Sequence, residues 1–493
     1  MFPKGFKFGY SLSGFQSEMG LSDEDPNSDW WKWVHDEVNI ESGLVSGDLP
    51  ENGVAYWDLY KKYHLLAKEL LVNAARLGVE WSRIFPKDTR EVKVTVEEKG
   101  HDIVDIEVTE SDLRRLDELA NKSAVAHYAE IFEDLKKNDI SLTLNAYHWP
   151  IPLYLHDPIE ARNAALSNEK NGWLSHATVV EFAKYSAYVA WKFSDFVESF
   201  SLMNEPNVVF GVGYVNVKGG FPPSFPSIHA ANLAKKHIIE ACARSFDCMK
   251  AYTDKPIGLI YGLSDIQNLS PQDKEVAEEA KYEGGYSFFD PLTKGDFRWV
   301  SRLSDNGPKF TEKNSSTNRP DLKGRIEWIG VNYYSRTVIE RRGKGHSVVP
   351  GYGQRCTPGT LSKDNRAVSE FGWEVYPKGL FNVLKDYHDK YHLPMAVLEN
   401  GIADSSDTLR PSFLVSHIHQ VEKAISDGIN VNGYYHWSLL DNYEWASGFR
   451  LKFGLVGVDL KTKEIEMRPS ALVFKRIAEN HGIPEDMEWM VSE

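Results

Sequence analysis

The sequence has few cysteines, no long apolar run and no excess of basic residues, and each absence excludes a class of protein. Its three cysteines, Cys242, Cys248 and Cys356, are too few and too scattered for a disulfide framework or a zinc site. No segment is apolar for long enough to cross a bilayer, and the chain opens without the apolar region of a signal peptide. The formal net charge of −15 argues against nucleic acid or an anionic membrane as partner. We therefore expect a cytoplasmic protein.

The chain has enough hydrophobic residues to form a large core, since they make up 42% of its 493 residues. Length alone would suggest about three domains. However, the chain has no internal repeat, no low-complexity linker and no break in composition. We therefore expect residues 1–493 to form a single domain.

Short apolar segments that read as buried strands alternate with segments of helical periodicity, such as Tyr56–Leu71, Val179–Val197 and Ala230–Tyr252. The eight predicted strands are Phe6–Leu12, Ala74–Val79, Ile140–Leu144, a segment ending at Glu205, Ile257–Tyr261, Trp328–Tyr334, Met395–Leu398 and Val431–Trp437. A charged hairpin is expected between Lys87 and Leu119, and a polar loop over Ser304–Lys323. This alternation predicts an α/β fold, a single (β/α)8 TIM barrel with elaborated loops, whose active site lies at the carboxyl ends of the strands.

Two of the predicted strands, the fourth and the seventh, end on a glutamate that is followed at once by a chain-breaking residue. Glu205 precedes Pro206, and Glu399 precedes Asn400 and Gly401. A lone strand-end acid is usually an exposed side chain. Two acids of the same design, on strands that lie roughly opposite each other in a ring of eight, favour a pair that faces across the barrel mouth. Such a pair suits the hydrolysis of glycosidic bonds.

Several further motifs carry a resemblance that covers nearly the whole chain. They are Gly14–Glu18, Glu80–Pro86, His148–Pro150, Asn204–Pro206, Phe371–Glu374, Glu399–Gly401 and Asp441–Trp445. With these motifs in this order, the sequence resembles glycoside hydrolase family 1, and most closely the β-glycosidases of thermoacidophilic archaea. The resemblance implies an exo-acting retaining β-glycosidase that hydrolyses terminal β-D-galactosides and β-D-glucosides through a covalent glycosyl-enzyme.

By the same resemblance Glu205 is the acid/base and Glu399 the nucleophile, with carboxyls about 5 Å apart. Glu399 must be ionised, and Arg83 is a candidate for the compensating charge. Tyr334 resembles the family's tyrosine that donates to the nucleophile. No metal and no organic cofactor is implied.

The family's sugar pocket maps onto further residues of this chain. Those expected to hydrogen-bond the terminal sugar are Gln16, His148, Trp149, Asn204, Glu444 and Trp445. Trp437, which a cis peptide bond is expected to join to Ser438, would form the floor under the sugar. Trp373 and Phe221 would form walls around the leaving group. An ionised Glu444 would accept hydrogen bonds from O4 and O6.

Two positions depart from the family pattern, because Leu202 and Leu398 stand where the family usually has threonine. Strand alternation predicts that both point away from the barrel mouth, towards the helices.

Two alternative functions stay open from the sequence. A 6-phospho-β-glycosidase is disfavoured because Glu444 would repel the phosphate, and an inactive sugar-binding relative because both glutamates are present. The expected partners are small β-glycosides and oligosaccharides and, by analogy with the archaeal relatives, further copies of the chain in a tetramer. The ranking of galactose, glucose and fucose stays open.

Overall fold

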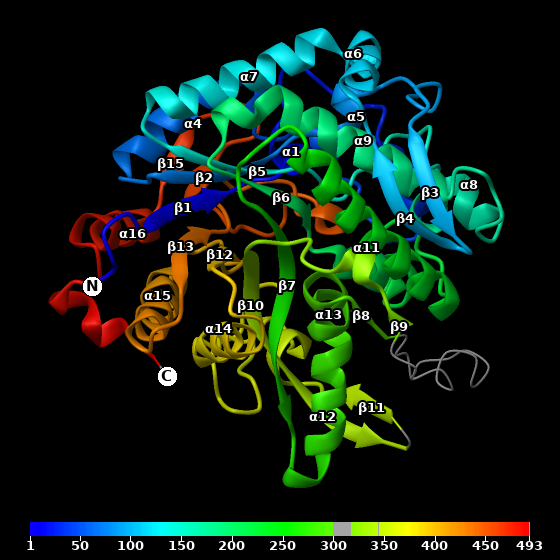
Figure 1. Ribbon diagram of the computed structural model, residues 1–493. Coiled ribbons are helices and arrows are strands. Elements are labelled where there is room, and N and C mark those ends of the chain that lie inside the picture. Colours follow the sequence, from blue (N-terminus) through cyan, green and yellow to red (C-terminus); the bar gives the residue numbers. More distant parts are fainter. Residues whose placement is uncertain (299–316, 344, 493) are drawn as a thin grey trace.

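A closed ring of parallel strands forms the centre of the computed structural model, which describes residues 1–298, 317–343 and 345–492 (Figure 1). Within these residues the ring has eight strands, and the pairing of β10 with β7 and of β13 with β1 closes it. The strands follow in the order β1 (Lys7–Ser11), β2 (Ala74–Gly78), β5 (Ser141–Asn145), β6 (Ser199–Asn204), β7 (Ile257–Asn268), β10 (Ile329–Arg342), β12 (Met395–Asn400) and β13 (Val431–His436). The predicted (β/α)8 barrel is confirmed.

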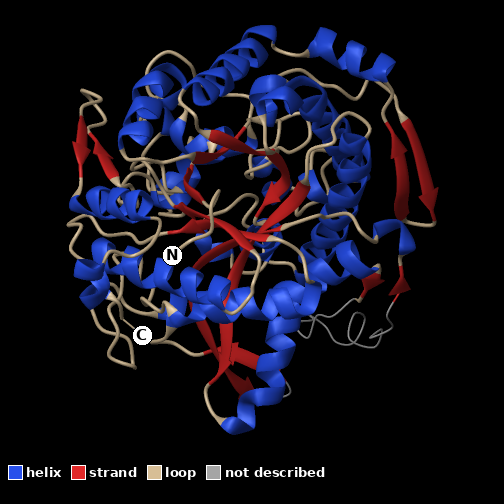
Figure 2. Ribbon diagram, turned by 60° about the vertical axis from the view of Figure 1, so that its left-hand side comes forward, coloured by secondary structure: helices blue, strands red, loops and turns tan. Residues whose placement is uncertain are grey.

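Helices surround this ring, as Figure 2 shows. The longer ones are α4 (Tyr56–Glu69), α6 (Glu110–Leu119), α7 (Lys122–Lys137), α9 (His176–Phe193), α11 (Ile228–Lys250), α14 (Lys378–Tyr391), α15 (Arg410–Ser426) and α16 (Pro469–Asn480). In α7 the buried Tyr128, Phe132 and Leu135 recur at helical spacing, and the Asn121 side chain accepts a hydrogen bond from the Ala124 N–H at the helix start. No helix in the described ranges is long and apolar enough to cross a membrane.

Shorter elements lie in the connections. They are α1 (Gly14–Ser17), α2 (Asp29–Val34), α3 (Glu37–Glu41), α5 (Trp81–Ile84), α8 (Pro158–Asn163), α10 (Pro206–Tyr214), α12 (Lys274–Lys281), α13 (Ser287–Lys294), β8 (Asp296–Phe297), β9 (Thr317–Asn318), β14 (Val456–Val458) and β15 (Ile465–Met467). The predicted charged hairpin is β3 (Thr95–Lys99) with β4 (Asp102–Glu107), which pair antiparallel. The predicted polar loop over Ser304–Lys323 lies largely outside the described residues.

Large side chains fill part of the barrel interior, because glycines on neighbouring strands leave room for them. A methyl group at Gly9 would lie 2.3 Å from the Tyr435 ring, and one at Gly258 would lie 2.2 Å from the Trp328 ring. Leu398 joins Trp328 and Tyr435 in this cluster.

The expectation that Leu398 points to the helices is therefore wrong. The register between β12 and β13 shifts between Val397 and Asn400, so simple alternation along the strand fails there. Leu202, in contrast, is fully buried within the large cluster that the helices share.

Strands β7 and β10 continue beyond the ring as a paired extension, which projects from the barrel together with β11 (Gly345–Val348) and α12 (Figures 1 and 2). β11 was not predicted, because its short sequence lies between glycines and reads as a loop.

Candidate active site

One large cavity lies at the carboxyl ends of the strands, with a volume of about 890 Å³. It brings together most of the predicted site residues, namely Gln16, His148, Trp149, Glu205, Phe221, Tyr334, Trp373, Glu399, Trp437, Glu444 and Trp445. Asn204 and Arg83 are not among the residues that line the cavity. The peptide bond between Trp437 and Ser438 is cis, as predicted.

Glu399 ends β12 and is held by one cation and one hydroxyl. Its Oε1 lies 2.6 Å from Nη1 of Arg76, and its Oε2 accepts a hydrogen bond of 2.7 Å from the Tyr334 hydroxyl. Burial raises the pKa of Glu399, while Arg76 and Tyr334 act against this rise by stabilising the ionised form. The predicted contact of Tyr334 with the nucleophile candidate is present.

The predicted role of Arg83 as the charge beside Glu399 is wrong. Arg83 lies on α5, after the end of β2, where its Nε is 3.0 Å from Oε2 of Glu18 and its guanidinium covers the Trp57 ring at 4.3 Å. Arg76 lies within β2 and points into the ring. The sequence held a signal for it, since a charge inside an apolar strand must find a buried partner.

Glu205 has a different environment from Glu399. It follows β6 with a left-handed backbone (φ 42°), and its Oε1 accepts a hydrogen bond of 2.9 Å from the neutral Asn332 side chain. Burial, and next the negative charge of Glu399, raise the pKa of Glu205 to about 8. Near neutral pH, Glu205 therefore holds its proton.

A chain of hydrogen bonds connects Arg76 to the cavity wall through Asn204. Oδ1 of Asn204 accepts hydrogen bonds from Arg76 (2.5 Å) and from Asn332 (3.0 Å), so its Nδ2 donates to Nε2 of His148 at 3.0 Å. Burial lowers the pKa of His148 well below its usual range, so the neutral ring carries its proton on Nδ1.

The Nδ1–H of His148 is therefore a hydrogen-bond donor for a ligand in the cavity. Among the described residues Nδ1 of His148 has no partner, and the His148 ring lines the cavity. Asn204 orients His148 in this way, and its expected contact with the sugar stays a prediction.

The expected sugar-binding residues from the two ends of the chain meet at one side of the cavity. The Gln16 side chain donates to Oδ1 of Asn442 (3.2 Å) and to the Tyr443 carbonyl (2.8 Å). Trp445 packs against Trp149 with ring centroids 4.5 Å apart. The segment around Glu444 is thus fixed to the segment around Gln16.

The carboxyl of Glu444 is enclosed, and its Oε2 is buried with no partner among the described residues. Burial, followed by the charges of Glu399 and Glu205, raises the pKa of Glu444 to about 8. The ionised Glu444 expected from the sequence is therefore disfavoured in the unliganded cavity.

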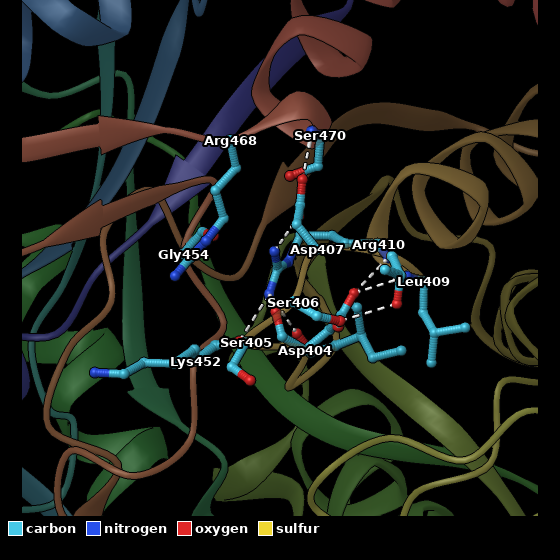
Figure 3. A network of polar contacts seen from close by, with 12 residues as sticks. Asp404, Ser405, Ser406, Asp407, Leu409, Arg410, Lys452, Gly454, Arg468 and Ser470 are labelled. Atoms are coloured by element: carbon cyan, nitrogen blue, oxygen red, sulfur yellow. Dashed lines mark hydrogen bonds and ion pairs between the residues drawn. The ribbon is translucent and has the colours of Figure 1, made fainter.

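A separate network of ion pairs fixes the loop that follows Glu399 (Figure 3). Arg410 pairs with Asp407 and donates to the carbonyls of Asp404 (2.6 Å) and Lys452 (2.8 Å). Next to it, Arg468 pairs with Asp441 at 2.7 Å. The network joins the loop after β12 to the motif that carries Glu444.

A closed (β/α)8 barrel with two buried glutamates of unequal environment at its mouth defines a glycoside hydrolase. The family model described as glycosyl hydrolase family 1 matches residues 1–103 and 117–483, and the chain belongs to this family. It is 50% identical to a β-galactosidase of Saccharolobus solfataricus, over 100% of this chain and 98% of that one. It is 43% identical to a β-galactosidase of Pyrococcus woesei, over 99% of each.

Solved structures agree with this assignment. The β-glycosidase of Thermosphaera aggregans superposes with a TM-score of 0.94 at 49% identity, covering 100% of this chain and 99% of that one. The resemblance to archaeal β-glycosidases is confirmed.

Proposed function

We propose that the protein is an exo-acting retaining β-glycosidase that hydrolyses terminal β-D-galactosides and β-D-glucosides, with residues 1–493 as one catalytic domain. The observation that carries this proposal is the unequal pair of glutamates. Arg76 and Tyr334 support the charge of Glu399, while Glu205 keeps a proton to a pKa of about 8. A retaining hydrolase requires such a division between an ionised nucleophile and a protonated acid.

In the first step, Glu399 attacks the anomeric carbon while Glu205 gives its proton to the departing oxygen. The resulting ester removes the charge of Glu399, so the pKa of Glu205 falls. Glu205 then accepts a proton from a water molecule as that water attacks the anomeric carbon, and the bond to Glu399 breaks to release its carboxylate. This mechanism requires a carboxyl separation of about 5 Å, which stays a prediction.

The proposed sugar site uses the Nδ1–H of His148 as donor, the Glu444 carboxyl as partner of O4 and O6, and Trp437 as floor. The relatives that share the whole chain are described as β-galactosidases and β-glucosidases, which supports both sugars as substrates. A 6-phosphate is disfavoured in the same place, because it would lie in the same cavity as the charged Glu399 and the Glu444 carboxyl offers it no positive charge.

The direct test is turnover of p-nitrophenyl β-D-galactoside and β-D-glucoside by purified protein, with Glu399→Gly purified in the same way as control. We expect turnover by the wild type alone. No turnover of either substrate, or a preference for the 6-phosphates, would contradict the proposal.

We also propose a homotetramer in the cytoplasm. A β-glucosidase mutant with 45% identity and a TM-score of 0.90 is described as derived from a tetrameric structure, which supports the assembly. Light scattering during gel filtration measures the mass in solution.

A further inference from the structure

The cavity residue that comes from the start of the chain, Gln16, lies on α1, a helix of only four residues. A single helical turn has too few internal hydrogen bonds to be stable without outside support. Within the described residues, no hydrogen bond joins the start of α1 to the side chain of its N-cap residue, Ser13. The Ser13 hydroxyl donates to Oε1 of Gln16 at 2.8 Å instead. The position of α1 therefore depends on a group from elsewhere in the chain.

Glu80, which follows β2, provides this group. Its Oε1 accepts a hydrogen bond of 3.0 Å from the Phe15 N–H, the second N–H of α1, across 65 residues of sequence. A methyl group at Gly14 would lie 2.5 Å from the same oxygen, so the Glu80 side chain lies directly against the first residue of α1. The side-chain oxygen of an ordinary N-cap residue accepts from the second or third N–H of its helix. Glu80 thus caps α1 from outside the helix.

The Glu80 side chain is buried, and its surroundings favour the neutral acid. The Glu80 N–H donates to the Tyr128 hydroxyl at 2.9 Å, and this hydroxyl donates to Glu18 at 2.9 Å. Arg83 lies 3.0 Å from Glu18 and favours its ionised form. Burial, followed by the negative charge of Glu18, raises the pKa of Glu80 well above its usual range. The acceptor at the start of α1 is therefore a neutral carboxyl oxygen, which an amide oxygen could replace.

The Gln16 side chain has one group left for a sugar. Both hydrogens of its amide nitrogen are used within the protein, by Oδ1 of Asn442 and by the Tyr443 carbonyl. Its Oε1 accepts from Ser13, which leaves one lone pair of this oxygen for a sugar hydroxyl. A hydrogen bond weakens steeply when its angle is poor, so a tilt of α1 would weaken the contact with the sugar.

We propose that Glu80 is a positioning residue for Gln16: by capping α1, it sets where the Gln16 carboxamide meets the terminal sugar. Glu80 is not among the residues that line the cavity, so it acts on the sugar through α1. This inference rests on the proposed function, in which Gln16 contacts the sugar, and it adds a residue that determines this contact.

The test is a double-mutant cycle in kcat/KM for p-nitrophenyl β-D-glucoside, with the wild type, Glu80→Met, Gln16→Ala and the variant that combines both changes. Methionine fills the place of glutamate but offers no oxygen. We expect Glu80→Met alone to lower kcat/KM about fivefold, the size of a typical N-cap contribution. In the Gln16→Ala background the same change should lower kcat/KM less than about twofold, because its effect passes through Gln16.

No loss in Glu80→Met, or an equal loss in both backgrounds, overturns the inference. The proposed function fails separately, if the wild type does not hydrolyse the glucoside. If Glu80→Met does not fold, Glu80→Asp takes its place in the cycle, because its shorter side chain withdraws the oxygen from Phe15.

Two further variants separate positioning from stability. Glu80→Gln keeps an oxygen that can accept from Phe15, so its kcat/KM should stay within about twofold of the wild type. Glu181→Met is the matched control, because Glu181 is also a buried glutamate, accepts a hydrogen bond of 2.6 Å from Thr89 and does not line the cavity. It should lower the melting temperature and leave kcat/KM below that temperature unchanged. A loss in either variant as large as that in Glu80→Met would also overturn the inference.

Discussion

The active-site cavity and the network drawn in Figure 3 both contain buried carboxyls and arginines. They differ in how many of the carboxyls have an arginine as partner. In the cavity, Arg76 supports the charge of Glu399 and also acts on Glu205, whereas burial and the other two carboxylates determine the pKa of Glu444. In the network, the loop aspartates pair with Arg410 and Arg468 and also accept backbone N–H groups, such as those of Leu409 and Ser470. Burial, followed by the charge of Glu399, is what makes a glutamate in the cavity hold a proton. The balanced network holds a loop in place instead.

A third cluster shows that a raised pKa alone does not mark an active site. Burial raises the pKa of Glu18 to about 7, and the nearby Glu80 is also shifted upwards, although Arg83 lies beside them. This cluster lies behind α1, where Phe15 N–H donates to Glu80 at 3.0 Å. Of these two clusters, the one around Arg76 combines raised pKa values with the large cavity.

The largest expected effect comes from removing the nucleophile candidate. Glu399→Gly should lower kcat/KM by about 10⁵-fold or more, because no covalent intermediate can form. Added azide or formate should restore part of the turnover of activated substrates by occupying the gap. Full activity in a pure preparation of this variant would show that another residue is the nucleophile.

Next in size is the loss of the arginine in the cavity. Arg76→Met leaves the Glu399 charge uncompensated, and we expect kcat/KM to fall by about 10²–10⁴-fold, as for a broken buried ion pair of about 3–5 kcal/mol. Arg83→Met is the matched control, because it should lower thermal stability while changing kcat/KM less than about tenfold. The opposite ranking of the two variants would restore the role first predicted for Arg83.

A substitution in the network of Arg410 and Arg468 should lower the stability of the protein and leave its catalytic mechanism unchanged. Arg410→Met leaves Asp407 buried without its cation, and we expect the free energy of unfolding to fall by about 3–5 kcal/mol, measured by denaturant titration. Below its melting temperature, the variant should keep the wild-type dependence of kcat/KM on pH. A shifted pH dependence would show that the two clusters are not separate.

The smallest of these effects concerns the sugar site. Glu444→Ser should lower kcat/KM for plain galactosides and glucosides by about 1–3 kcal/mol of transition-state binding, and should partly admit 6-phosphoglycosides. The control is Glu464→Ser, at an exposed position. Unchanged kinetics in Glu444→Ser would remove this residue from the sugar site.

Much of this molecule could be predicted from its sequence because short apolar strands alternate with amphipathic helices at regular intervals. The eight strands follow from apolar runs at regular intervals, and Glu205 and Glu399 follow from their places at strand ends. The partner of Glu399 could not be chosen in the same way, because it depends on which residue of β2 faces the ring. The predicted direction of the Leu398 side chain was wrong for a related reason, since a register shift changes the face to which a side chain points. The neutral state favoured for Glu444 depends on how many carboxyls share one cavity, which only the folded chain shows.

The most direct test of the claim that Glu205 holds its proton in the buried cavity is the pH dependence of kcat/KM for a glucoside whose leaving group must be protonated, such as an alkyl glucoside. Glu205 must be protonated to act as acid, and its pKa is raised to about 8. Activity should therefore persist below this value and fall as the pH rises through about 8, with an apparent pKa that belongs to the pair of glutamates. This basic limb should disappear in Glu205→Gln, measured with a leaving group that needs no proton. A wild-type limb near 4.5, the ordinary pKa of a glutamate, or a limb that persists in the variant, would contradict the account.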